Sequence, residues 1–311
     1  MIFNTEHIFK SYPWLKQKSL PMIVSASYDG LLCASLLKHH LDWELVGYYN
    51  HESLWVSQSA INHKKNIIWV DLNILPKQGK AVGGHIVSVD GFIPTGFETS
   101  CNPNILDGLT ANSFNSKFPF STLIFLIWLY KLKCPKDMMS KLLILNTDAT
   151  WLKFQNYPEN ANNWIKKLTN FDWPELFSGV NTKSFDSKMD QLLYPELLSI
   201  NSMKTFGKLK SKFLSIINKE LIINPDWDED SIMNIFELVS NHLSWNKPTL
   251  PSIIKRIDGV KNKCPLSKVK EIGLDKMITK KHIFSYAITS PRYFSYTTFG
   301  NNQKRVLDAK T

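Results

Sequence analysis

Residues 21–41 (PMIVSASYDGLLCASLLKHHL) constrain the fold most, because they predict a strand, a polar turn and a helix in immediate succession. The apolar run at 22–24 indicates a buried strand, and apolar residues after Gly30 recur at helical spacing. Strand, turn and helix form the first half of a βαβ unit, in which ligands bind at the carboxyl ends of the strands. Asp29 is expected at that end, where a carboxylate can bind a cation. The alternative is a plain Asp-Gly turn.

Further apolar runs predict buried strands at residues 44–49, 66–70 and 141–145. The run at 66–70 is continuously apolar, as in a parallel strand covered on both faces. Asp71 follows this run directly, and Asp148 lies just past the run at 141–145. An aspartate therefore stands at or just past the end of three predicted strands. The alternative is that Asp71 and Asp148 have a structural role and simply cap the helix or loop that follows each of them.

These elements predict an α/β fold, with a parallel sheet and helices on both faces, over residues 1–170. Ser121 is expected to cap a buried helix over 122–132. Residues 171–200 are interpreted as a connector, because the stretch 171–197 shows no clear period. A smaller basic α+β domain is expected over 201–311, with helices at 202–223 and 226–245 and with strands within 280–305.

The net charge of +10 is concentrated in the last third of the chain. Residues 1–202 hold 18 Lys and Arg against 17 Asp and Glu, whereas residues 203–311 hold 19 against 10. This asymmetry indicates a polyanionic partner, and a lysine-rich solvated surface is the alternative. Tyr286 and Phe294 are among the aromatic residues that could stack on bases. The residues expected to bind single-stranded DNA or RNA are Lys204, Lys208, Lys212, Arg292, Tyr293, Tyr296, Lys304 and Arg305.

The sequence predicts a cytoplasmic protein without a membrane span. Residues 1–20 lack the pattern of a secretory signal, and the apolar stretch at 118–132 is short for a bilayer. The four cysteines are far apart and form no CxxC pair, so we expect reduced thiols rather than a zinc site or disulfides.

His85 follows two glycines, which would allow its side chain to reach into a crevice. The alternative is that His85 is a lone histidine near an apolar strand and is not a ligand. If His85 joins Asp29, Asp71 and Asp148, the set suits Mn²⁺ or Mg²⁺ better than zinc. Such an ion polarises a phosphoryl oxygen and lowers the pKa of a bound water, as phosphoester hydrolysis requires.

The order of these residues over roughly 20–155 resembles the DHH phosphoesterase superfamily, which includes RecJ-type exonucleases. Its first motif, Asp-x-Asp-Gly before a small apolar helix, is similar to residues 27–30 (SYDG). Asp71 corresponds to the second motif and Asp148 to the fourth. Residues 84–86 (GHI) stand where the family has Asp-His-His. The segment 118–122 (FPFST) resembles the helix start found between the third and fourth motifs.

The resemblance implies that Asp29, Asp71, His85 and Asp148 hold one Mn²⁺ or Mg²⁺ ion and are the catalytic set. Ser27 replaces the first aspartate of motif one, and Gly84 and Ile86 replace two residues of motif three. These departures remove the second metal site, so the chain would work with one ion or with none. The family's glycine-rich histidine motif is absent, which leaves the C-terminal domain unassigned.

Two functions follow as hypotheses. The first is a metal-dependent phosphodiesterase or nuclease acting on single-stranded nucleic acid. The second is a catalytically inactive nucleic-acid-binding subunit, on the same fold, of a replication, repair or transcription assembly. Residues 25–30 also faintly resemble the phosphate loop of pyrophosphatase-type ATP-binding ligases, but both glycines of that loop are missing.

Overall fold

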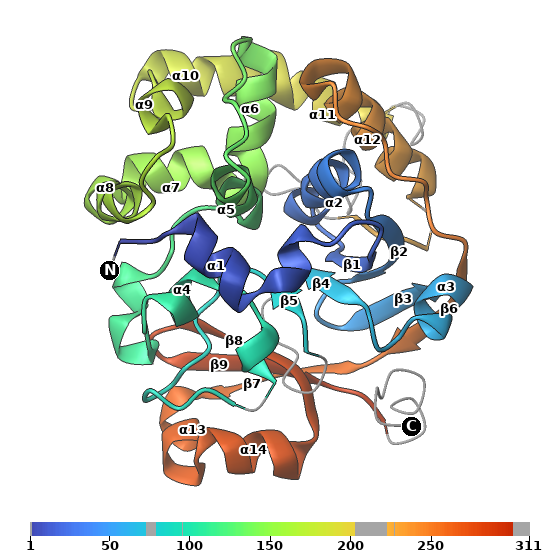
Figure 1. The fold of residues 1–311 in the computed structure, drawn as a ribbon, viewed down its shortest axis with the longest axis vertical. Helices are drawn as coiled ribbons and strands as arrows, with labels where there is room; N and C mark the ends of the chain where they lie inside the picture. Colours follow the sequence, from blue (N-terminus) through green and yellow to red (C-terminus); the bar gives the residue numbers. More distant parts are fainter. Residues whose placement is uncertain (1, 73–78, 95, 203–222, 227, 301–311) are drawn as a thin grey trace. The chain divides into compact units, whose positions relative to one another are not determined.

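The computed structural model describes residues 2–72, 79–94, 96–202, 223–226 and 228–300 (Figure 1). The chain divides into two compact units, each assembled from segments far apart in sequence. We call residues 1–5, 26–41 and 119–250 the helical unit, and residues 6–25, 42–118 and 251–311 the sheet unit. These units differ from the domain ranges 1–170, 171–200 and 201–311 expected from the sequence.

The described part of the sheet unit contains a mixed six-stranded sheet in the order β5-β4-β1-β2-β3-β6 (Figure 1). The expectation of an α/β fold is confirmed, but the sheet is parallel only across β5, β4, β1 and β2. β3 pairs antiparallel with β2 and with β6. The strands are β1 (Pro21–Ser25), β2 (Glu44–Tyr49), β3 (Ser53–Ser57), β4 (Ile68–Val70), β5 (Ala81–Val82) and β6 (Ile253–Asp258).

The antiparallel pairing of β2 and β3 follows from the short turn between them. The Asn50 side chain accepts hydrogen bonds from the backbone N–H groups of Glu52 (3.0 Å) and Ser53 (2.7 Å). A connection this short can join only antiparallel strands. Gly47 lies opposite Val56, and a Cβ on Gly47 would stand 2.3 Å from the carbonyl oxygen of Trp55. The pairing therefore requires glycine at residue 47.

A separate antiparallel sheet in the order β7-β9-β8 confirms the strands expected within 280–305. It comprises β7 (Val260–Pro265), β8 (Ile283–Ser290) and β9 (Tyr293–Thr298). One of its faces buries Ile288 and Phe294 against helices α13 (Leu266–Ile272) and α14 (Leu274–Lys281). The remaining helices of the sheet unit are α1 (Thr5–Ser11), η1 (Pro13–Lys16), α3 (Gln58–Asn62), η2 (Phe97–Thr99), α4 (Pro103–Leu106) and η3 (Ala111–Ser116).

In the helical unit, α2 (Tyr28–Leu41) packs against α5 (Thr122–Leu129) and α12 (Glu229–Leu243). Every residue of α5 is buried, as its uniformly apolar sequence predicts. Ser121 caps α5 by accepting a hydrogen bond from the N–H of Ile124 at 3.2 Å, which confirms the expected cap. The other helices are α6 (Met138–Asn146), η4 (Thr147–Ala149), α7 (Thr150–Asn156), α8 (Pro158–Lys167), α9 (Trp173–Phe177), α10 (Lys183–Lys188), η5 (Met189–Leu193) and α11 (Tyr194–Ser202).

One expectation for this unit is wrong. Residues 141–145 form part of helix α6 rather than a strand, and Asp137 caps that helix by accepting from the N–H of Ser140 at 2.9 Å. The range 171–200, which was expected to be a connector, is largely helical. The helix expected at 226–245 is confirmed as α12, whereas the one expected at 202–223 lies almost entirely outside the described residues. None of the described helices is both long and apolar enough to span a membrane.

Candidate functional site

Asp71 lies at the carboxyl edge of the parallel strands, as expected. β1 and β4 pair in parallel with Val24 opposite Val70, so the next residues, Ser25 and Asp71, lie side by side at the ends of the two strands. The Ser25 hydroxyl donates a hydrogen bond to the Asp71 carboxylate. Asp71 has φ +57°, a left-handed conformation that aspartate tolerates better than most residues. Asp71 is thus held at this edge by its neighbour on β1.

His85 lies three residues beyond β5 and is exposed. Two buried asparagines fix its backbone. Asn102 donates from Nδ2 to the carbonyl of His85 at 2.8 Å, and Asn104 donates from Nδ2 to the carbonyl of Gly84 at 2.6 Å. The sequence marked 102–104 only as turn-rich, so the role of these amides was missed.

A second histidine at this edge, His51, was not predicted. It follows β2, and the Thr297 hydroxyl on β9 donates to its carbonyl oxygen. Burial is the largest of the causes that lower the pKa of His51 to about 3, and the nearby charges of His85 and Lys261 contribute to the same shift. His51 is therefore neutral at physiological pH. His51, His85 and Lys261 lie near enough to one another to interact electrostatically.

Asp29, in the helical unit, caps a helix. Its side chain is 5% exposed, and its two oxygens accept hydrogen bonds from the N–H groups of Thr122 (2.9 Å) and Leu123 (3.1 Å). These are first-turn donors of α5, which have no partner within the helix. A carboxylate at this end also interacts favourably with the helix dipole. Asp29 thus has a structural role that requires no ion.

Asp148 lies in η4 and not after a strand, because the strand expected at 141–145 is a helix. Asp148 and Ala149 both adopt left-handed backbone conformations, with φ +47° and +48°. The Asp148 carboxylate forms an ion pair with the ammonium group of Lys153.

The residues implied by the resemblance do not fit a bound Mn²⁺ or Mg²⁺ ion. Across the described ranges, no three His, Cys, Asp or Glu side chains are grouped so as to hold a metal. Asp29 accepts two backbone hydrogen bonds, and Asp148 is paired with a cation.

Among the residues expected to bind nucleic acid, Tyr293 is 41% exposed and Arg292 is exposed beside it. Tyr296 packs against the core behind the small sheet, and burial raises its pKa. Tyr286 and Phe294 are 3% and 0% exposed, so stacking of either ring on a base is ruled out. The remaining residues of this set lie outside the described ranges: Lys204, Lys208, Lys212, Lys304 and Arg305.

The structure adds two lysines that the sequence reasoning missed. Lys261 and Lys263 are alternate residues of β7, so they share one face of the small sheet. Both are exposed, and Lys263 Nζ lies 4.1 Å from the centroid of the Tyr293 ring. The alternation in VKNKCP at 260–265 is the signal that would have revealed this face. Residues 251–300 as a whole carry ten Lys and Arg against three Asp and Glu.

The described residues form an α/β fold with a mixed six-stranded sheet and a separate three-stranded antiparallel sheet. No family model matches the chain, and neither a curated protein nor a solved structure is significantly similar to it.

Proposed function

We propose that this protein binds single-stranded nucleic acid without cleaving it, as a subunit of a replication, repair or transcription assembly. The proposed binding surface is the β7–β9 face, which we define as Lys261, Lys263 and Tyr293. We also propose that the α/β fold is a degenerate relative of the DHH type. Two correspondences support this ancestry: Asp71 stands at the end of β4, and His85 follows β5.

The pairing of Lys263 with the exposed ring of Tyr293 is the observation that carries the binding proposal. Proteins that bind single strands combine cationic side chains along the backbone with aromatic rings on which bases stack. Lys261 lies two residues before Lys263 on the same face of β7, so two ammonium groups follow one strand direction. Each can replace a counterion on a phosphate.

The preference for binding over hydrolysis rests on the misfit of the metal set. Asp29 and Asp148 already have partners that satisfy their carboxylates. Phosphodiester hydrolysis by a metal route requires an ion that activates water and stabilises developing charge. A binding function needs only the β7–β9 face.

The test is binding of fluorescein-labelled oligothymidine, measured by anisotropy over a series of KCl concentrations. A double Lys261→Ala, Lys263→Ala variant should weaken binding and reduce the slope of log K against log salt by about 1.4. The matched control is Lys18→Ala, Lys65→Ala, which removes the same charge from two exposed lysines of the same unit.

Binding that is indifferent to salt, or equal behaviour of the two double variants, would refute the proposal. The same oligonucleotide is incubated with Mn²⁺ to examine cleavage. Cleavage that Asp71→Asn abolishes would instead support the phosphodiesterase.

A further inference from the structure

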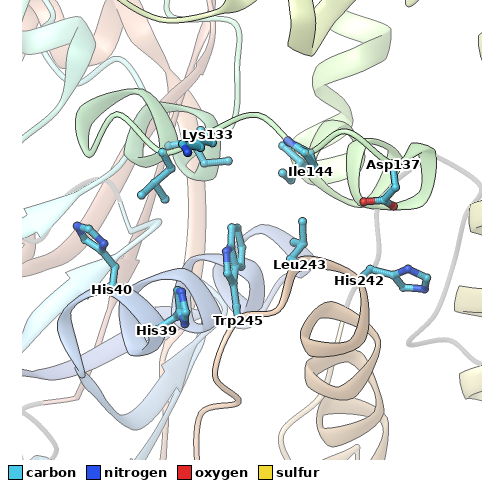
Figure 2. Close-up of a pocket in the computed structure, with 11 residues that line it drawn as sticks. His39, His40, Lys133, Asp137, Ile144, His242, Leu243 and Trp245 are labelled. Carbon is cyan, nitrogen blue, oxygen red and sulfur yellow. The ribbon is translucent and has the colours of Figure 1, made fainter.

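A cavity of about 300 Å³ lies within the helical unit (Figure 2). Three chain segments line it: the end of α2, a stretch that runs from α5 through the following loop into α6, and the end of α12 with the residues that follow. Its volume is at the lower end of the range typical of small-molecule sites. It shares no residue with the β7–β9 face, so the proposal for its occupant does not depend on the proposed nucleic-acid binding.

The middle of the cavity is apolar and aromatic. Figure 2 shows Trp245 and Leu243 facing Ile144 across it. Ile127 and Leu132 add further apolar lining. A flat apolar group fits between these side chains and would be stabilised by removing its surface from water.

The polar lining is predominantly basic. Lys133, His39 and His40 lie toward one end of the cavity, and His242 lies toward the other beside Asp137 (Figure 2). Asp137 supplies the one carboxylate that the described residues contribute to the lining, and its oxygen accepts the capping hydrogen bond from the N–H of Ser140. The lining therefore contains one lysine and three histidines against one carboxylate, whose oxygen already accepts a hydrogen bond.

The helix ends account for the histidines but not for Lys133. His39 and His242 lie in the last turns of α2 and α12, where basic groups offset the helix dipole. His39 Nδ1 accepts a hydrogen bond from the N–H of Asn246 at 3.4 Å, so a neutral ring carries its proton on Nε2 as a donor. Lys133 lies in the loop and is exposed, so its ammonium can turn toward a ligand in the cavity at little cost in desolvation.

We propose that this cavity binds a small organic anion with a flat apolar body, of the aromatic carboxylate class. The apolar body lies between Trp245 and Ile144, and the carboxylate lies at the end formed by Lys133, His39 and His40. Lys133 supplies a charge-assisted hydrogen bond, which is stronger than one between neutral groups. A cationic ligand would meet the ammonium group of Lys133 and is disfavoured.

The probes are 1-naphthoate, its neutral amide and 1-naphthylmethylamine, titrated into the full chain by isothermal calorimetry. We expect saturable binding of naphthoate, weaker binding of the amide and weakest binding of the amine. Lys133→Gln should weaken naphthoate binding about tenfold, because one charge-assisted hydrogen bond is lost, and should leave the amide nearly unchanged. Lys136→Gln is the matched control, since Lys136 is exposed in the same loop but does not line the cavity.

Trp245→Ala should weaken naphthoate and the amide alike, because it removes the apolar contact that both share. Circular dichroism of each variant verifies that the helices are retained. The proposal is overturned if naphthoate does not bind at millimolar concentration or if the amine binds best. It is also overturned if the two lysine variants bind naphthoate equally.

Discussion

The side-chain amide of Asn104 donates a 2.6 Å hydrogen bond to the carbonyl oxygen of Gly84, the residue before His85. The oxygen of the same amide accepts a 2.7 Å hydrogen bond from the N–H of Phe118. One buried side chain thus links the loop that presents His85 to the segment that precedes α5. Both backbone groups would lose their partner if the amide were removed.

Asn104→Ala should therefore lower the free energy of unfolding by about 2–4 kcal/mol, because it leaves buried polar groups unpaired. Urea denaturation measures this loss. Asn112→Ala is the control, since Asn112 is exposed, and it should change stability by less than about 1 kcal/mol. Equal losses in the two variants would show that the Asn104 hydrogen bonds contribute little.

Gly47→Ala should disrupt the pairing of β2 with β3. The added Cβ would stand 2.3 Å from the carbonyl oxygen of Trp55, and backbone atoms cannot move aside cheaply. We expect a loss of about 3 kcal/mol or more, or failure to fold. At Gly108, where an added Cβ would meet no atom within 4 Å but φ is +69°, alanine should cost only about 1 kcal/mol of backbone strain. Thermal denaturation of both variants distinguishes steric overlap from strain.

Asp29→Ala should destabilise the protein by about 2 kcal/mol, because the N–H groups of Thr122 and Leu123 lose their acceptors. Asp29→Asn should lose less, since an amide oxygen can still accept one of the two hydrogen bonds. Glu159→Ala, at an exposed position in the first turn of α8, serves as the control. If Mn²⁺ raised the melting temperature of the wild type but not of Asp29→Asn, Asp29 would be a metal ligand after all.

His51 makes stability depend on pH. Its folded-state pKa of about 3 lies below the ordinary value of 6.5, so the unfolded chain binds the proton more readily. The contribution of His51 to the free energy of unfolding is fully present above about pH 6.5 and is lost as the pH falls toward 3. His51→Gln should therefore lose less stability than the wild type between about pH 7.5 and about pH 5 in urea denaturation. His63→Gln, at an exposed histidine, should retain the wild-type decline.

Tyr293→Ala should weaken binding of oligothymidine about fivefold or more, because one base loses its stacking partner. The salt dependence should stay unchanged, since no phosphate contact is removed. Tyr293→Phe should bind like the wild type, because the ring is retained. Tyr157→Ala is the matched control at a tyrosine that is 63% exposed. A fivefold loss in this control as well would mean that the effect is not specific to the β7–β9 face.

Strands were predictable where a run of apolar residues was long and flanked by turn residues. Residues 44–49 were correctly predicted as β2. The run at 141–145 was misassigned because a short, continuously apolar segment fits a buried helix as well as a strand. β3 was missed because its five residues lie within a polar segment, and their burial depends on pairing with β2 and β6.

The residues of the candidate site also divide into those that the sequence could place and those that it could not. Asp71 could be placed at the carboxyl edge because it directly follows β4. The capping role of Asp29 was hidden, since its partners Thr122 and Leu123 are 93 and 94 residues away in sequence. His51 was missed because its environment is formed by β9, which packs against the end of β2 and is distant in sequence. Contacts between distant segments leave no local pattern in a single sequence.

β6 completes the large sheet from the far end of the chain: the Ser53 hydroxyl on β3 donates to the Asp258 carboxylate, 205 residues later, at 2.6 Å. During synthesis the outer edge of β3 therefore has no hydrogen-bonding partner until β6, near the end of the chain, has been translated and has left the ribosome. An unsatisfied strand edge is a template for association with other chains. Truncated translation products that end before β6 would accordingly be prone to aggregate and to depend on chaperones.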